Sequence, residues 1–121
     1  MIYLASPYTD VLPEKMQERY ELARDATAHL LARCIWVYSP IVHCHDLAVA
    51  ATLPRTFDFW AEYNFHMLAR ADKLVVLEIP GWAVSVGVGA EIAFWRTVKG
   101  KPLYLASPND CKAGNLDRVP A

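Results

Sequence analysis

One ionisable side chain lies in the apolar stretch "PGWAVSVGVGAEIAFW", residues 80–95, and it is Glu91. A carboxylate among apolar side chains costs free energy unless another group compensates it. A carboxylate that faces a crevice can attack an electrophilic sugar carbon and form a glycosyl-enzyme. The structural alternative is a contact between subunits or a hydrogen bond to nearby backbone. The residue type and its surroundings leave both interpretations open.

Small residues precede this carboxylate, and they are Gly81, Ser85, Gly87 and Gly89. Glycine permits tight turns and a close approach of the backbone to a ligand. Free N–H groups at the start of a helix favour an anion such as a phosphate. The hydroxyl of Ser85 adds a further donor. The loop and the helix that follows it therefore predict a site for a sugar or a phosphate.

Four short apolar runs are the elements that would position this loop. Their residue types predict strands, and their continuous hydrophobicity indicates burial on both faces. Three of them end in Ser-Pro, where proline cannot extend the ladder. The predicted strands cover 2–7, 35–40, 73–79 and 103–108.

Helical spacing of apolar residues separates the runs. The predicted helices cover 14–34, 55–71 and 87–99. Gly100 is expected to end the last of them. We expect an irregular excursion with about one helical turn in 41–54, and a surface tail in 109–121. Strands alternating with helices predict an α/β fold, a doubly wound parallel sheet of four or five strands with helices on both faces.

Ligands of such sheets bind outside the carboxyl ends of the strands. The residues expected at that rim are Ser6, Pro7, Tyr8, Ser39, His43, Gly81, Trp82, Ser85 and, at the edge, Ser107.

The motif "SVGVGAE", with S-x-G-x-G-x-E spacing, resembles the signature of the nucleoside 2-deoxyribosyltransferase superfamily. It is especially similar to that of the 2'-deoxynucleoside 5'-phosphate N-hydrolases. The stretches "IYLASPYT", "SPIVH", "ADKLVVL" and "GKP" fit the same pattern, and "GW" before the motif resembles a small bacterial branch of the superfamily. The resemblance covers roughly residues 2–105.

The resemblance implies a flavodoxin-like sheet and a Glu nucleophile at the anomeric carbon of the sugar. Water then completes hydrolysis, or a second base completes transfer. Glu91 matches that nucleophile. Ser85 matches a serine that helps hold the 5'-phosphate in the phosphate-reading members, and since the transferases have an Asp there that contacts the sugar, a sugar contact is the alternative. Tyr3, Ser6 and Tyr8 fall where the family lines its sugar and base pocket. The implied substrate is a nucleoside or nucleoside 5'-monophosphate, without a cofactor, and the implied assembly is a homo-oligomer that completes sites across subunits.

The chain departs from the family pattern at Asn64, eight positions before Asp72, where the family has an Asp. That Asp is expected to help protonate the departing base or to steer the nucleophile, and Asn cannot exchange a proton. Asn64 lies on the apolar stripe of its helix, so we expect it to point inward. Either it only positions the substrate, or another acid such as Asp46 or Asp58 replaces it, or the site binds nucleotides as a regulatory module without turnover.

Histidines and cysteine cluster in "HCHD", residues 43–46. A metal site needs further converging ligands, and no second cluster supplies them, so no metal is expected. His43 is a candidate for contact with a base or phosphate, and His45 is expected to be an ordinary loop histidine.

Other side chains are assigned by pattern. Trp82 is a candidate for ligand contact, and Arg19 is expected to be a solvated charge. The residues expected in the core or a subunit interface are Trp36, Trp60 and Trp95, with Phe94 beside Trp95 forming an adhesive face. Cys34 is expected to be a buried apolar filler.

Composition limits the partners. The 121 residues fit a single domain, 1–121, and carry a formal net charge of −1 and a pI of about 6.4. This balance gives no reason to expect binding to a nucleic acid polymer or an anionic membrane. Three cysteines without a paired framework fit a reducing compartment. We expect no signal peptide and no membrane span, and hence a cytoplasmic protein acting on a small molecule.

Overall fold

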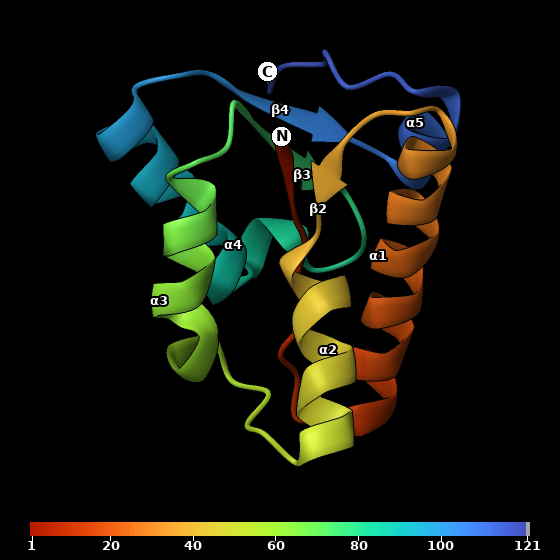
Figure 1. Ribbon diagram of the computed structural model, residues 1–121, viewed down its shortest axis with the longest axis vertical. Helices are drawn as coiled ribbons and strands as arrows, with labels where there is room; N and C mark the ends of the chain where they lie inside the picture. Colours follow the sequence, from red (N-terminus) through yellow and green to blue (C-terminus); the bar gives the residue numbers. More distant parts are fainter. Residues whose placement is uncertain (121) are drawn as a thin grey trace.

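The computed structural model describes residues 1–120, which form an α/β structure around one sheet (Figure 1). The strands are β1 (Ile2–Ala5), β2 (Val37–Tyr38), β3 (Lys73–Leu77) and β4 (Leu103–Ala106). All neighbouring pairs are parallel, and the order is β2-β1-β3-β4. This order is the beginning of the 2-1-3-4-5 arrangement of flavodoxin-like sheets. The predicted doubly wound parallel sheet is confirmed.

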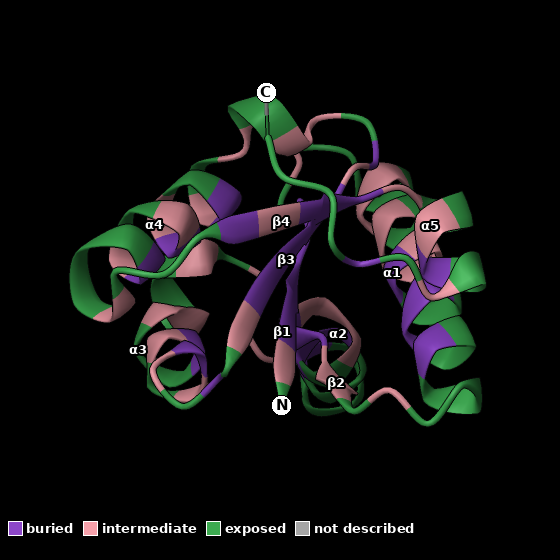
Figure 2. Cartoon of the chain, turned by 90° about the horizontal axis from the view of Figure 1, so that it is seen from above, coloured by how far each residue is buried: buried purple, intermediate pink, exposed green. Residues whose placement is uncertain are grey.

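Helices cover both faces of this sheet (Figure 2). The helices on one face are α1 (Pro13–Ala32) and α5 (Pro108–Ala113), and those on the other are α3 (Phe57–Leu68) and α4 (Val86–Phe94). The short helix η1 (Trp82–Val84) precedes α4, and the π-helical turn η2 (Trp95–Lys99) continues it. Gly100 ends that turn with φ of 61°, as the sequence predicts.

The core lies on both sides of the two central strands. Tyr3 and Ala5 of β1 pack with the α3 and α4 side, whereas Leu4 between them packs with the α1 side. Every residue of β3 from Leu74 to Leu77 is fully buried. The prediction of strands buried on both faces is therefore confirmed, and these strands hold the loops at their carboxyl ends rigidly.

The expectation of an irregular excursion in 41–54 is wrong, because α2 (Pro40–Ala51) occupies most of it. Ser39 caps this helix, since its hydroxyl accepts the Val42 N–H at 3.2 Å, and Pro40 begins it. The same device begins α5, where Ser107 and Asp110 form a capping box. A Ser-Pro pair here ends a strand and also starts a helix, so β2 ends at Tyr38.

The tail is also more ordered than the expected surface segment. It forms α5, which buries Cys111, and it buries Leu116 after that helix. Leu105 of β4 donates its N–H to the Arg118 carbonyl at 2.7 Å, in an antiparallel bridge. The guanidinium of Arg118 pairs with Glu78 and Asp110. The segment after α5 therefore lies along the outer edge of β4.

Three further expectations about packing need correction. Cys34 is exposed, with φ of 59°, because the chain turns there directly after α1. Trp36 is 67% exposed, so the core placement is wrong for it, and the alternative of a subunit interface stays a prediction. Trp95 is fully buried, as expected for a residue of the core. Phe94 stacks on Phe65, with ring centroids 5.0 Å apart. These two aromatic residues therefore form no adhesive face.

Within residues 1–120, no helix has both the length and the apolar character that a membrane crossing requires.

Candidate functional site

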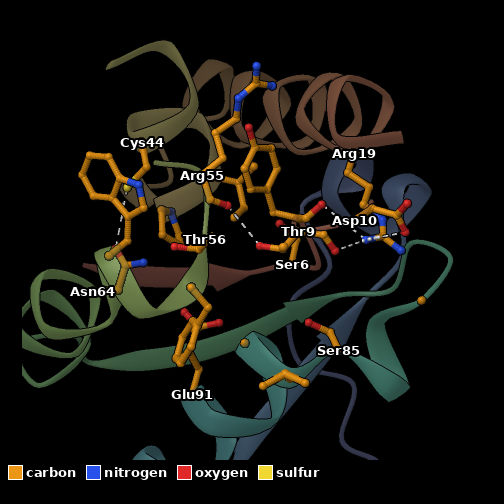
Figure 3. Close-up of a pocket in the computed structure, with 18 of the residues that line it drawn as sticks. Ser6, Thr9, Asp10, Arg19, Cys44, Arg55, Thr56, Asn64, Ser85 and Glu91 are labelled. Carbon is orange, nitrogen blue, oxygen red and sulfur yellow. Dashed lines mark hydrogen bonds and ion pairs between the residues drawn. The ribbon is translucent and has the colours of Figure 1, made fainter. Parts of the chain in front are cut away.

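A cavity of about 390 Å³ opens outside the carboxyl ends of β1 and β3 (Figure 3). The strand order reverses between these two strands, so this is the switch point at which such sheets bind ligands. The volume lies within the range of roughly 300–1,000 Å³ usual for small-molecule sites. Its walls come from the loop after β1, from α1, α2 and α3, from the loop after β3 and from the start of α4.

Glu91 lies in the wall of the cavity on α4 and is 4% exposed. The Tyr3 hydroxyl donates a hydrogen bond to its Oε2. Burial raises the pKa of Glu91 to about 7, and the hydrogen bond from Tyr3 opposes that rise. Burial and the adjacent carboxylate raise the pKa of Tyr3, so Tyr3 stays a neutral donor. Tyr3 itself does not line the cavity, and it acts by orienting the carboxylate.

The start of α4 faces the same cavity. Ser85 is the N-cap, and its hydroxyl oxygen accepts the Val88 N–H at 3.2 Å. The hydroxyl hydrogen of Ser85 remains able to donate to a ligand. Val86 and Gly87 line the cavity in the first turn, where a helix leaves N–H groups without intrahelical acceptors. This end of the cavity is therefore suited to an anion.

The three glycines before Glu91 have different roles. Gly81 has φ of 95°, so it supplies the predicted turn. Gly87 is helical, and a Cβ there would lie 3.2 Å from the Phe57 ring, so it permits α3 and α4 to pack closely. Gly89 is helical and exposed, and a Cβ there would meet nothing. Gly89 lies within α4, so it shapes no turn, and it does not line the cavity.

Ser6 and Arg19 complete the polar end. Ser6 is 4% exposed, and its hydroxyl has no hydrogen-bond partner within residues 1–120. Unlike Ser39 and Ser107, it caps no helix, so its hydroxyl is free for a ligand. The Arg19 guanidinium donates to the carbonyls of Tyr8 and Thr9 and lies in the cavity wall. The expectation of a solvated Arg19 is wrong, because its side chain is only 15% exposed.

Asn64 lies in the wall at the other end of the cavity and is 7% exposed, so the predicted inward orientation is confirmed. The Cys44 thiol donates to its Oδ1 at 3.8 Å. Asp46 and Asp58, the two candidates to replace the missing acid, are exposed and do not line the cavity. Neither is placed to exchange a proton with a ligand there.

Two other predicted contacts lie elsewhere. His43 does not line the cavity, whereas Ile41, two residues before it on α2, does. Residues two apart on a helix face nearly opposite directions, so His43 points outward. It is exposed and stacks on Tyr63, which contacts its Nε2 at 3.1 Å. Trp82 packs against the core on the α3 and α4 side and does not line the cavity.

Tyr8 does line the cavity, as expected. Its hydroxyl lies 2.6 Å from Nδ1 of His45, which is buried and stacked on Tyr20 at 4.0 Å. Burial, together with the nearby Arg55 guanidinium, lowers the pKa of His45. His45 is therefore no ordinary loop histidine, and it holds the Tyr8 side chain in place.

Pattern reasoning missed several wall residues, namely Asp10, Cys44, Arg55, Thr56, Phe57 and Trp60. Three of these six, Cys44, Arg55 and Thr56, lie on α2 or in the loop after it, and the sequence did not predict α2 as a helix. The Ser-Pro start of α2 was the signal that would have found them. Trp60, expected in the core or an interface, is instead a wall residue whose Nε1 donates to the Pro54 carbonyl.

Residues 1–120 contain no group of three or more His, Cys, Asp or Glu side chains arranged to hold a metal ion.

The sheet order and the cavity together define an α/β protein with a crevice at the switch point of a parallel sheet and a buried carboxylate in its wall. Residues 1–108 match the family described as "Domain of unknown function (DUF1937)", and the chain belongs to that family. No curated protein matches the chain. The resemblance of the motif at 85–91 to the nucleoside 2-deoxyribosyltransferase superfamily stays a prediction.

Proposed function

We propose that this protein is an enzyme that breaks or exchanges the N-glycosidic bond of a nucleoside or nucleoside 5'-monophosphate. The observation that carries the proposal is the buried carboxylate of Glu91 in the cavity wall, oriented by the Tyr3 hydroxyl. A carboxylate that is little hydrated and held in one orientation is suited to nucleophilic attack. Its raised pKa leaves a large fraction ionised near neutral pH.

The polar end of the cavity supports the substrate class. Ser6, Ser85 and the first turn of α4 offer hydroxyl and backbone donors, and Arg19 adds a positive charge beside them. Such donors suit the sugar hydroxyls or the 5'-phosphate. In the proposed reaction Glu91 forms a bond to the anomeric carbon while the bond to the base breaks. Water or a second base then displaces the carboxylate and regenerates it.

A second function comes from a different class, and Asn64 favours it. The position at which the family pattern has an Asp carries a neutral amide, and among the described residues the other carboxyls that line the cavity are Asp10 and Glu91. A pocket that offers hydrogen-bond donors but no acid to protonate a leaving base is also suited to binding a nucleotide without turnover. In that case the protein is a regulatory module that uses the same crevice.

Incubation with a panel of 2'-deoxynucleosides and their 5'-monophosphates separates the two functions. The enzyme releases free base, and Glu91→Ala abolishes the release, whereas the module binds in calorimetry and releases none. A 2-fluoro-2-deoxy nucleoside gives the more direct test, because it traps a sugar on the nucleophile. Mass spectrometry is expected to find the added sugar on a peptide that contains Glu91. Loss of base release in a folded Glu62→Gln control, on exposed α3 surface, would argue against this assignment.

We also propose a homo-oligomer. Val84 and Val86 at the cavity mouth and Phe59 on α3 expose apolar surface, at 85%, 80% and 49% respectively. Light scattering gives the oligomeric state, and a monomer at all concentrations would refute this part of the proposal.

A further inference from the structure

Asn64 presents only one end of its amide to the cavity. Its Oδ1 accepts a hydrogen bond from the Cys44 thiol at 3.8 Å, whereas its Nδ2 donates no hydrogen bond to another group of residues 1–120. Figure 3 shows the sulfur on one side of the amide and the nitrogen turned toward the cavity. Because an amide nitrogen only donates, a ligand atom in contact with the Asn64 Nδ2 must be a hydrogen-bond acceptor.

The other titratable groups of the cavity wall do not supply a proton at this end. Asp10 lies beside Arg19 at the opposite end, and its Oδ1 accepts the Leu12 N–H. The Tyr8 hydroxyl is hydrogen-bonded to His45. Burial and the charge of Glu91 raise the pKa of Cys44 to about 12, so its thiol keeps its proton. A base that leaves from this site therefore departs without protonation by a wall residue.

We infer that Asn64, oriented by the Cys44 thiol, donates its amide hydrogen bond to a base that departs as an anion. This inference rests on the proposed function and names its substrate class: nucleosides or nucleotides whose free bases are acidic N–H compounds, such as oxopyrimidines and oxopurines. Cys44 is a positioning residue in this mechanism, because it acts on the ligand only through the amide.

The electron balance is simple. A carboxylate oxygen of Glu91 forms the bond to the anomeric carbon, and the pair of the C–N bond moves onto the base nitrogen. One negative charge thereby passes from Glu91 to the base, where the Asn64 N–H stabilises it. Water then adds its oxygen to the anomeric carbon, the ester bond to Glu91 breaks, and the proton of that water neutralises the base. No net acid is consumed.

The test compares two substrates that differ in leaving-group acidity and hardly in size. These are 2'-deoxyuridine 5'-monophosphate and its 5-fluoro analogue, whose base is the stronger acid. Without acid catalysis, the stability of the anion controls the rate, so the wild-type kcat/KM is expected to be at least about tenfold higher for the fluorinated substrate. The 5'-monophosphates of 2'-deoxyinosine and 2'-deoxyadenosine form the matching purine pair, with the inosine nucleotide the faster.

Variants locate the effect. Asn64→Asp places a carboxylic acid at the base, so the ratio between the two pyrimidine substrates is expected to fall by at least about fivefold, and an alkaline limb is expected in its pH profile. Cys44→Ala frees the amide to rotate and is expected to lower kcat/KM by about fivefold, the value of one hydrogen bond, with a smaller change in KM. Cys34→Ser, at an exposed cysteine, is the control.

Equal rates for the two pyrimidine substrates in the wild type would overturn the inference alone and leave the glycosidase in place. An unchanged ratio in Asn64→Asp would do the same, and Cys44→Ala kinetics identical to those of Cys34→Ser would overturn the role of Cys44. If the folded wild type releases no base from any of the four nucleotides, the proposed function falls and this inference falls with it.

Discussion

Replacement of Glu91 by Gln is expected to change the pH dependence of stability, whatever the substrate is. Burial raises the pKa of this carboxyl from 4.5 to about 7, a difference of 7 − 4.5 = 2.5 units. Each unit corresponds to about 1.36 kcal/mol between the two protonation states, which gives about 3 kcal/mol. The side chain is 4% exposed, so solvent does not screen this value appreciably.

The sign follows from proton binding. Between pH 4.5 and 7 the folded protein holds the proton that the unfolded chain has lost, so the stability falls as the pH rises. The contribution of Glu91 is fully present below pH 4.5 and is lost once the pH has passed about 7. Gln is neutral at every pH, so the free energy of unfolding of the Glu91→Gln variant lacks this dependence. The free energy of unfolding of the variant, taken relative to that of the wild type, is therefore expected to rise by about 3 kcal/mol between pH 4.5 and pH 8.5.

Urea denaturation at pH 4.5, 6.5 and 8.5, followed by tryptophan fluorescence, measures this difference. Other titrating groups cancel, because they are the same in both proteins. Glu62→Gln, at an exposed glutamate on α3, is the matched control and is expected to show no pH-dependent difference. If the difference between Glu91→Gln and wild type is flat across this range, the carboxylate is not desolvated and the reasoning about its reactivity fails.

Four further outcomes follow from single substitutions. Tyr3→Phe removes the hydrogen bond that lowers the pKa of Glu91, so the pH at which kcat/KM rises is expected to move upward. Gly81→Ala puts a Cβ 2.6 Å from a guanidinium nitrogen at a residue with φ of 95°, so thermal unfolding is expected to show a loss of stability of about 1–3 kcal/mol. Gly89→Ala adds a methyl group on open helical surface and is expected to stabilise the protein by up to about 1 kcal/mol. Ser6→Ala breaks no hydrogen bond, so the melting temperature is expected to stay unchanged while calorimetry shows about fivefold weaker binding of a 2'-deoxynucleoside 5'-monophosphate.

The fold was predictable from sequence where packing follows periodicity. The apolar runs of β1, β3 and β4 are buried on both faces, and no other placement removes them from water. Helix α2 was not predictable by the same means, since Ser39-Pro40 has two functions at one point of the chain. It ends a strand because proline cannot pair, and it starts a helix because serine caps and proline fits the first turn.

The candidate site divides in the same way. Residues on predicted elements, such as Glu91, Asn64 and Ser85, do meet at one cavity, because the carboxyl ends of parallel strands meet at one edge. Arg19 and Cys44 were not predictable as wall residues, since their side chains reach the cavity only through the packing of α1 and α2. His43 shows the converse error, in which a residue near a strand end is turned outward by a helix that the pattern did not reveal.

The segment that follows α5 limits how this protein associates with itself. Leu105 pairs with Arg118 in a single antiparallel bridge, which occupies part of the β4 edge, and the opposite edge, β2, offers only two residues. Neither edge offers a long stretch of unpaired backbone to which a strand of another molecule could add. Such strand addition is the usual route to β-sheet aggregation. Any copies that assemble must therefore meet through helices and loops. Proteolytic removal of the residues after 113 would expose the β4 edge. The first consequence of the cleavage is then expected to be aggregation of the protein and not loss of the cavity.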